Sequence, residues 1–227
     1  MCGRFGRLSR FERIAQLTAL SIRNEAGEFA SNYNVAPGTL QPVILNTNEG
    51  AVLRPLLWGL VPYWAPDPKR GARPVNARAE SAAERPMFRK LITHRRCLIP
   101  ADWYYEWKVT PTGKIPHLMQ MASREPFLLG GLWDTWHYGR EDALATFTVL
   151  TTLPNELAAT IHDRMPLIVA PEEAPRWLDR DEHDVKDLLR PYPAEEMTAY
   201  PVSPRVNSSK NDGPELIEPL ISLCGPS

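Results

Sequence analysis

Cys2 is the residue in this chain with the most distinctive chemistry, because it directly follows the initiator Met1. If Met1 is removed, Cys2 carries a free α-amine and a thiol on adjacent carbons. An α-amine titrates near ~7.7–8.0 and a thiol near ~8.5, so both supply a nucleophilic fraction at neutral pH. An aldehyde would form an imine with this amine, and the thiol would then close a five-membered thiazolidine. The alternative is that a small second residue merely permits removal of Met1.

Glu106 is a second candidate, because it stands among aromatic residues in Tyr104–Lys108. Desolvation in such a strand would favour the protonated carboxyl group that a general acid needs. Strand alternation could equally place Glu106 on a wet face between aromatic residues. The sequence therefore leaves a catalytic and a structural interpretation open.

Two further segments hold polar groups at short spacing. Ile161–Pro166 places His162 beside Asp163 and Arg164 at a predicted helix-to-strand turn, which is typical either of an acid–base site or of a salt-bridged cap. Asn76–Glu80 offers long polar side chains two residues apart, which point the same way in an extended strand. Near the N-terminus, three arginines could bind phosphate or could simply be solvated: Arg4, Arg7 and Arg10.

Composition sets the class of protein. The chain has 227 residues, of which 43% are hydrophobic, so it can bury a substantial core. It has no long apolar run for a transmembrane helix, and its start is basic where a signal peptide would be apolar. Three scattered cysteines suit neither a disulfide framework nor structural zinc, which predicts a reducing, cytoplasmic setting; Cys97 and Cys224 are expected to be packed or incidental.

The net charge of −1 conceals an asymmetry along the chain. Residues 1–124 carry 18 Lys/Arg and 9 Asp/Glu, whereas residues 125–227 carry 8 and 18. A basic half suits a surface that follows phosphates. Alternatively, the two halves interleave in space and cancel.

The elements that must position these groups are mostly short strands. Ser9 and Glu12 form a capping box that predicts a first helix from near Ser9, and Val109–Lys114 predicts a hairpin turn. The succession of short strands, without regular βαβ alternation, predicts one α+β domain with a mainly antiparallel, barrel-like β core and flanking helices. The predicted strands are Pro42–Leu45, Ala51–Gly59, Cys97–Ile99, Tyr104–Val109, Pro116–Met121, Phe127–Trp133, Thr146–Thr152 and Pro166–Val169, and the later helices are Asn155–Ile161, Glu172–Leu178 and Glu182–Leu189.

Taken together, seven segments resemble the SRAP family, the SOS-response-associated peptidases, whose members process abasic sites in DNA. The resemblance runs from Cys2 to about Pro219, with the motifs in the family's order, which implies a single SRAP domain over residues 1–227 with a core of about 2–219 and a short C-terminal tail. The segments are Met1–Phe5, Tyr33–Pro37, Trp58–Pro62, Asn76–Glu80, Tyr105–Trp107, Ile161–Pro166, and Pro201–Ser203 with Val206 and Asn207.

This resemblance implies a function for the candidate residues. Cys2, exposed by loss of Met1, would form a thiazolidine with the ring-opened sugar aldehyde of an abasic site in single-stranded DNA, with no metal or organic cofactor. The matching active-site positions are Cys2, Asn76, Glu106 and His162. The positions matching DNA contacts are Arg4, Arg78, Arg164, Trp64 and Met87. Trp103 departs from the pattern, since many relatives have a small residue there.

The resemblance also implies a DNA-damage response protein, monomeric, away from membranes and associated with the nucleoid. Such a protein would combine lyase-like crosslinking to DNA with removal of its own Met1. Two alternatives remain: a thiol peptidase, including one confined to its own chain, and a non-covalent module that only shields single-stranded DNA. A peptidase should cleave added peptides, whereas a pure binder should form no bond that survives denaturation.

Overall fold

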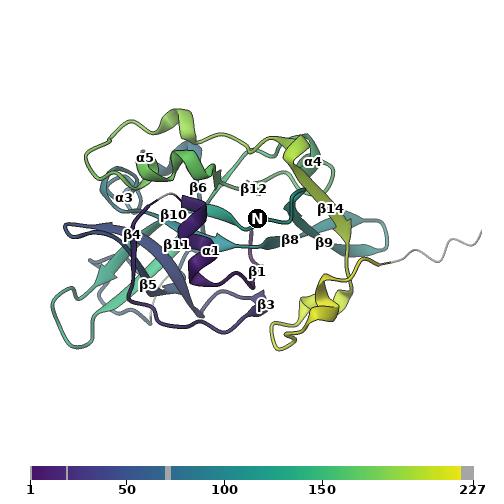
Figure 1. The fold of residues 1–227 in the computed structure, drawn as a ribbon, viewed down its shortest axis with the longest axis horizontal. Coiled ribbons are helices and arrows are strands. Elements are labelled where there is room, and N and C mark those ends of the chain that lie inside the picture. The colour runs from purple at the N-terminus through teal and green to yellow at the C-terminus, as the bar shows by residue number, and fades with distance from the viewer. Residues whose placement is uncertain (1, 19, 70–72, 221–227) are drawn as a thin grey trace, which may run out of the picture.

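Two β-sheets form the framework of the protein (Figure 1). The computed structural model describes residues 2–18, 20–69 and 73–220. Most strand pairs are antiparallel, and the described helices are short, so the predicted α+β class with a mainly antiparallel core is confirmed. No helix among these residues is both long enough and apolar enough to cross a membrane.

The larger sheet has nine strands and supplies most of the core. Its order is β12-β11-β10-β7-β4-β5-β2, with β13 paired to β10 and β6 paired to β11. Three of its pairs are parallel: β11 with β5, β11 with β6, and β2 with β5. The strands are β2 (Ile22–Asn24), β4 (Leu40–Thr47), β5 (Gly50–Trp58), β6 (Asn76–Arg78), β7 (Arg96–Ala101), β10 (Phe127–Trp136), β11 (Leu144–Thr152), β12 (Met165–Pro166) and β13 (Ile168–Val169).

The smaller sheet has five strands and contains the start of the chain. Its order is β14-β9-β8-β1-β3. The strands are β1 (Phe5–Arg7), β3 (Asn32–Val35), β8 (Trp103–Thr110), β9 (Gly113–Met121) and β14 (Met197–Pro201). The two sheets share one buried cluster, in which Phe5 of β1 packs on Trp58 of β5 with ring centroids 5.2 Å apart.

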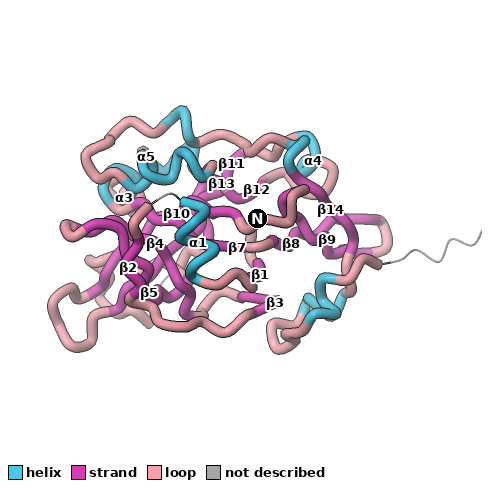
Figure 2. Tube along the Cα trace, viewed as in Figure 1, coloured by secondary structure: helices cyan, strands magenta, loops and turns pink. Residues whose placement is uncertain are grey.

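Seven of the eight predicted strands were found with shifts only at their ends, whereas Pro166–Val169 is divided into β12, which pairs with β11, and β13, which pairs with β10. The predicted hairpin joins β8 to β9. Thr110 pairs with Gly113 at its tip, where Gly113 has a φ of 129°, a region that favours glycine. Figure 2 shows short helices at the edge of the strands. The α-helices are α1 (Phe11–Thr18), α2 (Ala79–Ala82), α3 (Leu91–His94), α4 (Glu156–Ala159) and α5 (Ala174–Leu178), and the 3₁₀ turns are Pro171–Glu173, Lys186–Leu188, Ala194–Glu196, Pro204–Asn207 and Pro214–Ile217.

The capping-box prediction for the first helix was wrong in detail. The helix begins at Phe11, and the N–H groups of Arg13 and Ile14 donate to the carbonyl of Arg10. Ser9 instead donates its hydroxyl to Asp102 Oδ1 at 2.5 Å. Ser9 therefore ties the helix entrance to the β7–β8 connection.

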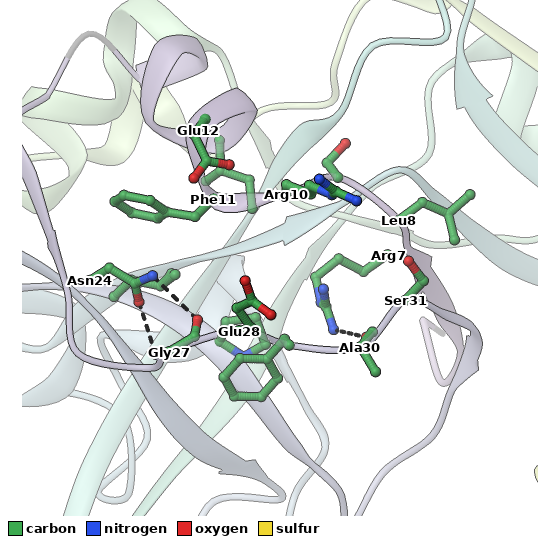
Figure 3. Close-up of a pocket in the computed structure, with 15 residues that line it drawn as sticks. Arg7, Leu8, Arg10, Phe11, Glu12, Asn24, Gly27, Glu28, Ala30 and Ser31 are labelled. Carbon is green, nitrogen blue, oxygen red and sulfur yellow. Dashed lines mark hydrogen bonds between the residues drawn. The ribbon is translucent and has the colours of Figure 1, made fainter.

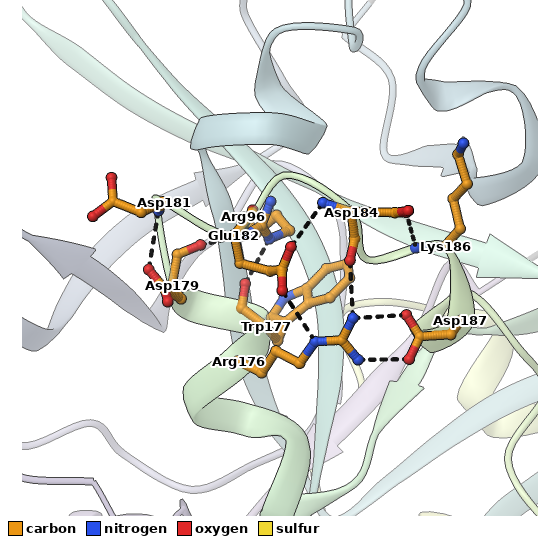
Figure 4. Close-up of polar contacts among 9 residues, drawn as sticks. All are labelled: Arg96, Arg176, Trp177, Asp179, Asp181, Glu182, Asp184, Lys186 and Asp187. Atoms are coloured by element: carbon orange, nitrogen blue, oxygen red, sulfur yellow. Dashed lines mark hydrogen bonds and ion pairs between the residues drawn. The ribbon is translucent and has the colours of Figure 1, made fainter.

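The helix predicted over Glu182–Leu189 is reduced to one 3₁₀ turn, Lys186–Leu188. Figure 4 shows the reason: the buried Arg96 guanidinium binds backbone carbonyls of this loop, including that of Glu182 at 2.8 Å. Arg176 pairs with Asp187 and also donates to the carbonyl of Asp184. Two arginines thus take up carbonyl groups that a helix would need for its own hydrogen bonds.

The basic and acidic halves of the sequence do not separate in space. Strand β11 of the acidic half pairs with β5 and β6 of the basic half. Ion pairs also cross between the halves, Arg13 with Glu125 and Arg164 with Glu80. The structure therefore favours interleaving over one basic face.

Candidate functional site

Cys2 is held where the chain enters the smaller sheet. Strand β1 pairs antiparallel with β8, with Phe5 opposite Tyr104 and Gly6 opposite Trp103. The Tyr105 N–H then donates to the carbonyl of Arg4 at 2.9 Å, which extends this register toward the N-terminus. The Cys2 side chain is completely buried. The first residues are therefore anchored along β8 rather than projecting as a free arm (Figure 1).

Glu106 faces the same buried cluster as Cys2. Successive side chains of a strand alternate between faces, so Glu106 shares a face of β8 with Tyr104, which packs in the cluster that contains Cys2. Glu106 is only 2% exposed. Its negative charge raises the pKa of the Cys2 thiol. The interpretation of Glu106 as a carboxylate on a wet face is therefore excluded.

The surroundings of the Cys2 thiol change its protonation. Burial is the main cause that raises the pKa of the thiol, and the negative charge of Glu106 raises it further. A hydrogen bond from the backbone N–H of Arg4 acts in the opposite direction but is the weaker influence. In the folded chain with Met1 in place, the resting group is the thiol. The nucleophilic fraction expected of an unperturbed thiol does not apply here.

Asn76 contacts Cys2 directly from the larger sheet. Strand β6 places Asn76 opposite Val149 of β11, in a parallel pair. The side-chain amide Nδ2 donates to the carbonyl oxygen of Cys2 at 2.7 Å. The amide oxygen Oδ1 is buried and has no hydrogen-bond partner among the described residues. Asn76 thus fixes the backbone of Cys2 and keeps one buried acceptor available.

His162 follows α4 in a short turn before β12. Its Nδ1 accepts the backbone N–H of Arg164 at 3.0 Å, and Oδ1 of Asp163 lies 2.9 Å from the same nitrogen. A neutral Nδ1 can accept from Arg164, whereas a protonated Nδ1 can donate to Asp163. The ring therefore has a partner in either protonation state, which suits a group that moves a proton.

Arg164 connects the His162 turn to the segment that carries Asn76. Its guanidinium binds both carboxylate oxygens of Glu80 at 2.8 Å and the carbonyl of Thr151 at 2.5 Å. Only 11% of the Arg164 side chain is exposed. A planar guanidinium held by a bidentate carboxylate is a rigid link. Cys2, Asn76 and Glu106 therefore gather directly, and the Arg164–Glu80 ion pair ties the turn that holds His162 to the segment that carries Asn76.

The predicted DNA contacts fall into two groups. Arg78 and Trp64 are exposed, with 55% of Trp64 accessible, and Met87 is half-buried against the neighbouring core. Arg4, in contrast, donates to Asn34 Oδ1 at 2.8 Å and to the carbonyl of Val206 at 2.9 Å. Among these residues, Arg78 and Trp64 are freely accessible in this state, whereas Arg4 and Arg164 are engaged with the protein.

Trp103 lies on the face of β8 opposite Glu106. It packs in a separate cluster with Tyr105 and Leu118, and its indole covers Gly6 of β1. A side chain at Gly6 would overlap that indole. The large residue at position 103 is thus accommodated by a glycine on the neighbouring strand, away from the side on which Cys2 lies.

A separate cavity of about 380 Å³ lies between α1 and the 24–31 loop (Figure 3). Arg7 enters it from β1, is 4% exposed, and donates to the carbonyl of Ala30 at 2.8 Å. Arg10, Glu12 and Glu28 also line the cavity, so basic and acidic groups oppose one another there. Arg7 is consequently not a solvated phosphate ligand, whereas Arg10 is exposed.

Two participants were not assigned by sequence reasoning. Glu80 holds Arg164, and Asn34 joins Arg4 to the C-terminal segment by donating to the carbonyls of Ser208 and Asn211. Both residues lie inside the motifs quoted above. Glu80 is 84 residues from Arg164, and Asn34 is more than 170 residues from Ser208 and Asn211, so no local sequence pattern indicates these contacts. Cys97 is buried, as expected, whereas Cys224 and Met1 lie outside the described residues. No group of three or more His, Cys, Asp or Glu side chains within the described ranges is arranged to hold a metal ion.

Comparison with known proteins gives consistent matches over almost the whole chain. The chain is 44% identical to the abasic site processing protein YoqW of Bacillus subtilis, over 96% of this chain and 99% of the relative. It is 33% identical to the abasic site processing protein YedK of Escherichia coli, over 97% and 100%. A crystal structure of a Bacteroides thetaiotaomicron protein superimposes with a TM-score of 0.83 at 24% identity, covering 97% of this chain and 100% of that one, which shows a shared fold.

The profile of one protein family covers the residues described above. It matches residues 1–209, from the Cys2 segment through the Arg4 contact at Val206. The chain therefore belongs to the SOS response associated peptidase (SRAP) family.

Proposed function

We propose that this protein binds single-stranded DNA and crosslinks covalently to abasic sites through Cys2. The observation that carries the proposal is the convergence of Asn76 and Glu106 on a second-position cysteine. The relatives named abasic site processing proteins, in bacteria and in Xenopus tropicalis, point to the same substrate. We take the chain to act as one domain and as a monomer.

The first chemical requirement is to open the abasic sugar. An abasic deoxyribose is mostly a closed hemiacetal, so the C1′–O4′ bond must break while the hydroxyl on C1′ loses its proton and O4′ gains one. Glu106 and His162 are the groups suited to this transfer. Each would contribute ~10²–10⁴-fold if well placed. The two partners at Nδ1 of His162 would hold the ring steady in both protonation states.

The second requirement is attack by Cys2 once Met1 has been removed. The α-amine adds to the aldehyde, the adduct takes up a proton from a general acid, and water leaves, which gives a protonated imine. The thiol then loses its proton to a base, and sulfur bonds to the imine carbon while the π electron pair moves to nitrogen. Because burial and Glu106 hold the resting thiol in its protonated form, the base must act at this step. Glu106 is the candidate base because its charge acts on the Cys2 sulfur, and Asn76 would keep the Cys2 backbone in position.

The DNA backbone would be held by cations that give affinity without sequence preference. Arg78 is the exposed cation adjacent to Asn76 and would contact phosphate directly. Arg4 and Arg164 would shape the site around the lesion, since both are anchored by the protein. Trp64 would stack on an exposed base, with Met87 contributing an apolar contact.

Peptidase activity is the second candidate, because the family description itself names a peptidase. A thiol at residue 2 suits one self-directed cut that removes Met1 better than the repeated cleavage of other proteins. We therefore include removal of Met1 in the proposal. A non-covalent binder would not need Glu106 and Asn76 beside the thiol.

The proposal is tested by crosslinking to an oligonucleotide that carries one abasic site. We expect an adduct that survives denaturation with single-stranded DNA, and little with intact duplex, because pairing and stacking hold the sugar in the helix. A variant with one residue inserted before Cys2 should form none, since its α-amine is no longer on Cys2. Cleavage of added peptides without any adduct would instead support the peptidase.

A further inference from the structure

Tyr104 is a buried phenol on the same face of β8 as Glu106. Its side chain is 0% exposed and packs in the cluster that contains Cys2. Its ring meets that of Phe127 edge-on, with centroids 6.4 Å apart. The ring is thus a fixed part of the core, which leaves the hydroxyl in a defined position.

The Tyr104 hydroxyl has no hydrogen-bond partner within the part of the chain that the structure describes. Burying an unpaired hydroxyl costs free energy, and a phenylalanine would fill the same space without that cost. Its neighbour Tyr105 differs, because the Tyr105 hydroxyl donates to the carbonyl of Tyr33 at 2.8 Å. The unpaired hydroxyl of Tyr104 therefore indicates an acceptor that is formed at another stage of the reaction.

Two acidic groups that share this buried region with Tyr104 are the candidates for that acceptor: Cys2, which packs in the same cluster, and Glu106, which lies on the same face of β8. Burial is the largest cause that raises the pKa of Tyr104, followed by the negative charges that Cys2 and Glu106 carry when ionised. The phenol is therefore protonated throughout the neutral pH range. Toward an anion it acts as a hydrogen-bond donor. The negative charge of Glu106 also raises the pKa of the Cys2 thiol, so a thiolate formed there is the anion that a neutral donor would stabilise.

We propose that Tyr104 donates a hydrogen bond to the Cys2 sulfur when the thiol loses its proton during thiazolidine closure. This inference rests on the proposed function. In the step concerned, the thiol proton passes to the Glu106 carboxylate, the C–S bond forms at the imine carbon, and the π electron pair neutralises the nitrogen. Tyr104 keeps its own proton throughout. Its hydrogen bond stabilises the sulfur while the sulfur bears negative charge.

The test compares Tyr104→Phe with Tyr105→Phe, which removes a hydroxyl from the next residue on the opposite face. Under single-turnover conditions with saturating protein, Tyr104→Phe should form the denaturation-stable adduct about 10- to 100-fold more slowly. Reductive trapping of the imine by cyanoborohydride should proceed at the wild-type rate. Tyr105→Phe should crosslink normally but unfold at a lower temperature, because it leaves the Tyr33 carbonyl unpaired.

Alkylation of Cys2 by iodoacetamide, without DNA, on protein that has lost Met1 and read by mass on the peptide that begins at Cys2, measures the same interaction independently of crosslinking. Removing a donor to the thiolate raises the pKa of the thiol, so the rise of alkylation rate with pH should move to higher pH in Tyr104→Phe. If the alkylation profile of Cys2 shifts between wild type and Tyr104→Phe as expected, yet wild type forms no adduct with DNA, the proposed function fails while the Tyr104 contact stands. Wild-type adduct rate and wild-type alkylation profile in Tyr104→Phe would overturn the inference, and so would a loss of thermal stability that accounts for the slower rate.

Discussion

The two faces of strand β8 differ in how their polar groups are satisfied. On one face Tyr105 donates to the carbonyl of Tyr33, and Trp107 Nε1 donates to Asn207 Oδ1 at 2.7 Å. On the other face Tyr104 and Glu106 stand in the core beside Cys2, and the Tyr104 hydroxyl has no partner among the described residues. The paired donors of Tyr105 and Trp107 stabilise the fold, whereas the buried hydroxyl of Tyr104, unpaired among the described residues, indicates a site.

The largest expected effect comes from Cys2→Ala. This variant removes the thiol and with it both ring closure and thiol addition, so the denaturation-stable adduct should disappear. DNA binding should persist, because the phosphate contacts lie on other residues. Gel-shift titration and denaturing electrophoresis of the same samples measure the two properties. A heat-stable adduct at wild-type yield in Cys2→Ala would contradict the role given to this face of β8.

Glu106→Gln should have the next largest effect. The substitution keeps the shape of the side chain and removes proton transfer, so crosslinking should slow by ~10²-fold or more. Affinity for single-stranded DNA should change little. The matched control is Trp107→Phe on the opposite face, which should crosslink at the wild-type rate. If Glu106→Gln weakened binding but crosslinked normally at saturation, Glu106 would have a structural role.

Gly6→Ala tests the opposite face by its effect on stability. The added methyl group would overlap the Trp103 indole, and the strands would have to separate. We expect a loss of ~1–3 kcal/mol in the free energy of unfolding. Urea denaturation measures it, and the double variant Gly6→Ala with Trp103→Leu should recover part of the loss. Equal stability of wild type and Gly6→Ala would show that this packing is looser than described.

The smallest effect is expected from Arg78→Ala. Loss of one phosphate contact on single-stranded DNA should reduce the log–log salt slope of binding by about 0.7 and weaken all sequences alike. Binding isotherms at several salt concentrations, measured with two unrelated sequences, give the slope. An unchanged slope would place the DNA away from Arg78.

The sequence predicted the longer strands because alternating apolar runs and turn residues are local signals, and the hairpin from β8 to β9 followed from such signals. Strands β1, β2, β3, β6 and β14 are only three to five residues long and were not predicted. The helix over Glu182–Leu189 was wrong because the carbonyls of Glu182 and Asp184 accept hydrogen bonds from Arg96 and Arg176 instead.

The candidate site shows the same division between local and distant signals. Cys2 and Glu106 stood out by residue type and position, Asn76 and His162 stood out in short polar clusters, and the family motifs assigned all four to one active site. The engagement of Arg4 by Val206 and of Arg164 by Glu80 depends on contacts between distant segments. The pKa of the Cys2 thiol likewise depends on burial, which the first residues of a sequence do not indicate.

The most direct test of the central claim is the intact mass of the protein after reaction with single-stranded DNA that carries one abasic site. A thiazolidine at Cys2 predicts a single adduct whose mass equals the chain without Met1 plus the oligonucleotide minus one water. The adduct should require no reducing agent, and digestion should place it on the peptide that begins at Cys2. An adduct on chains that retain Met1, or one attached to any other residue, would contradict the account.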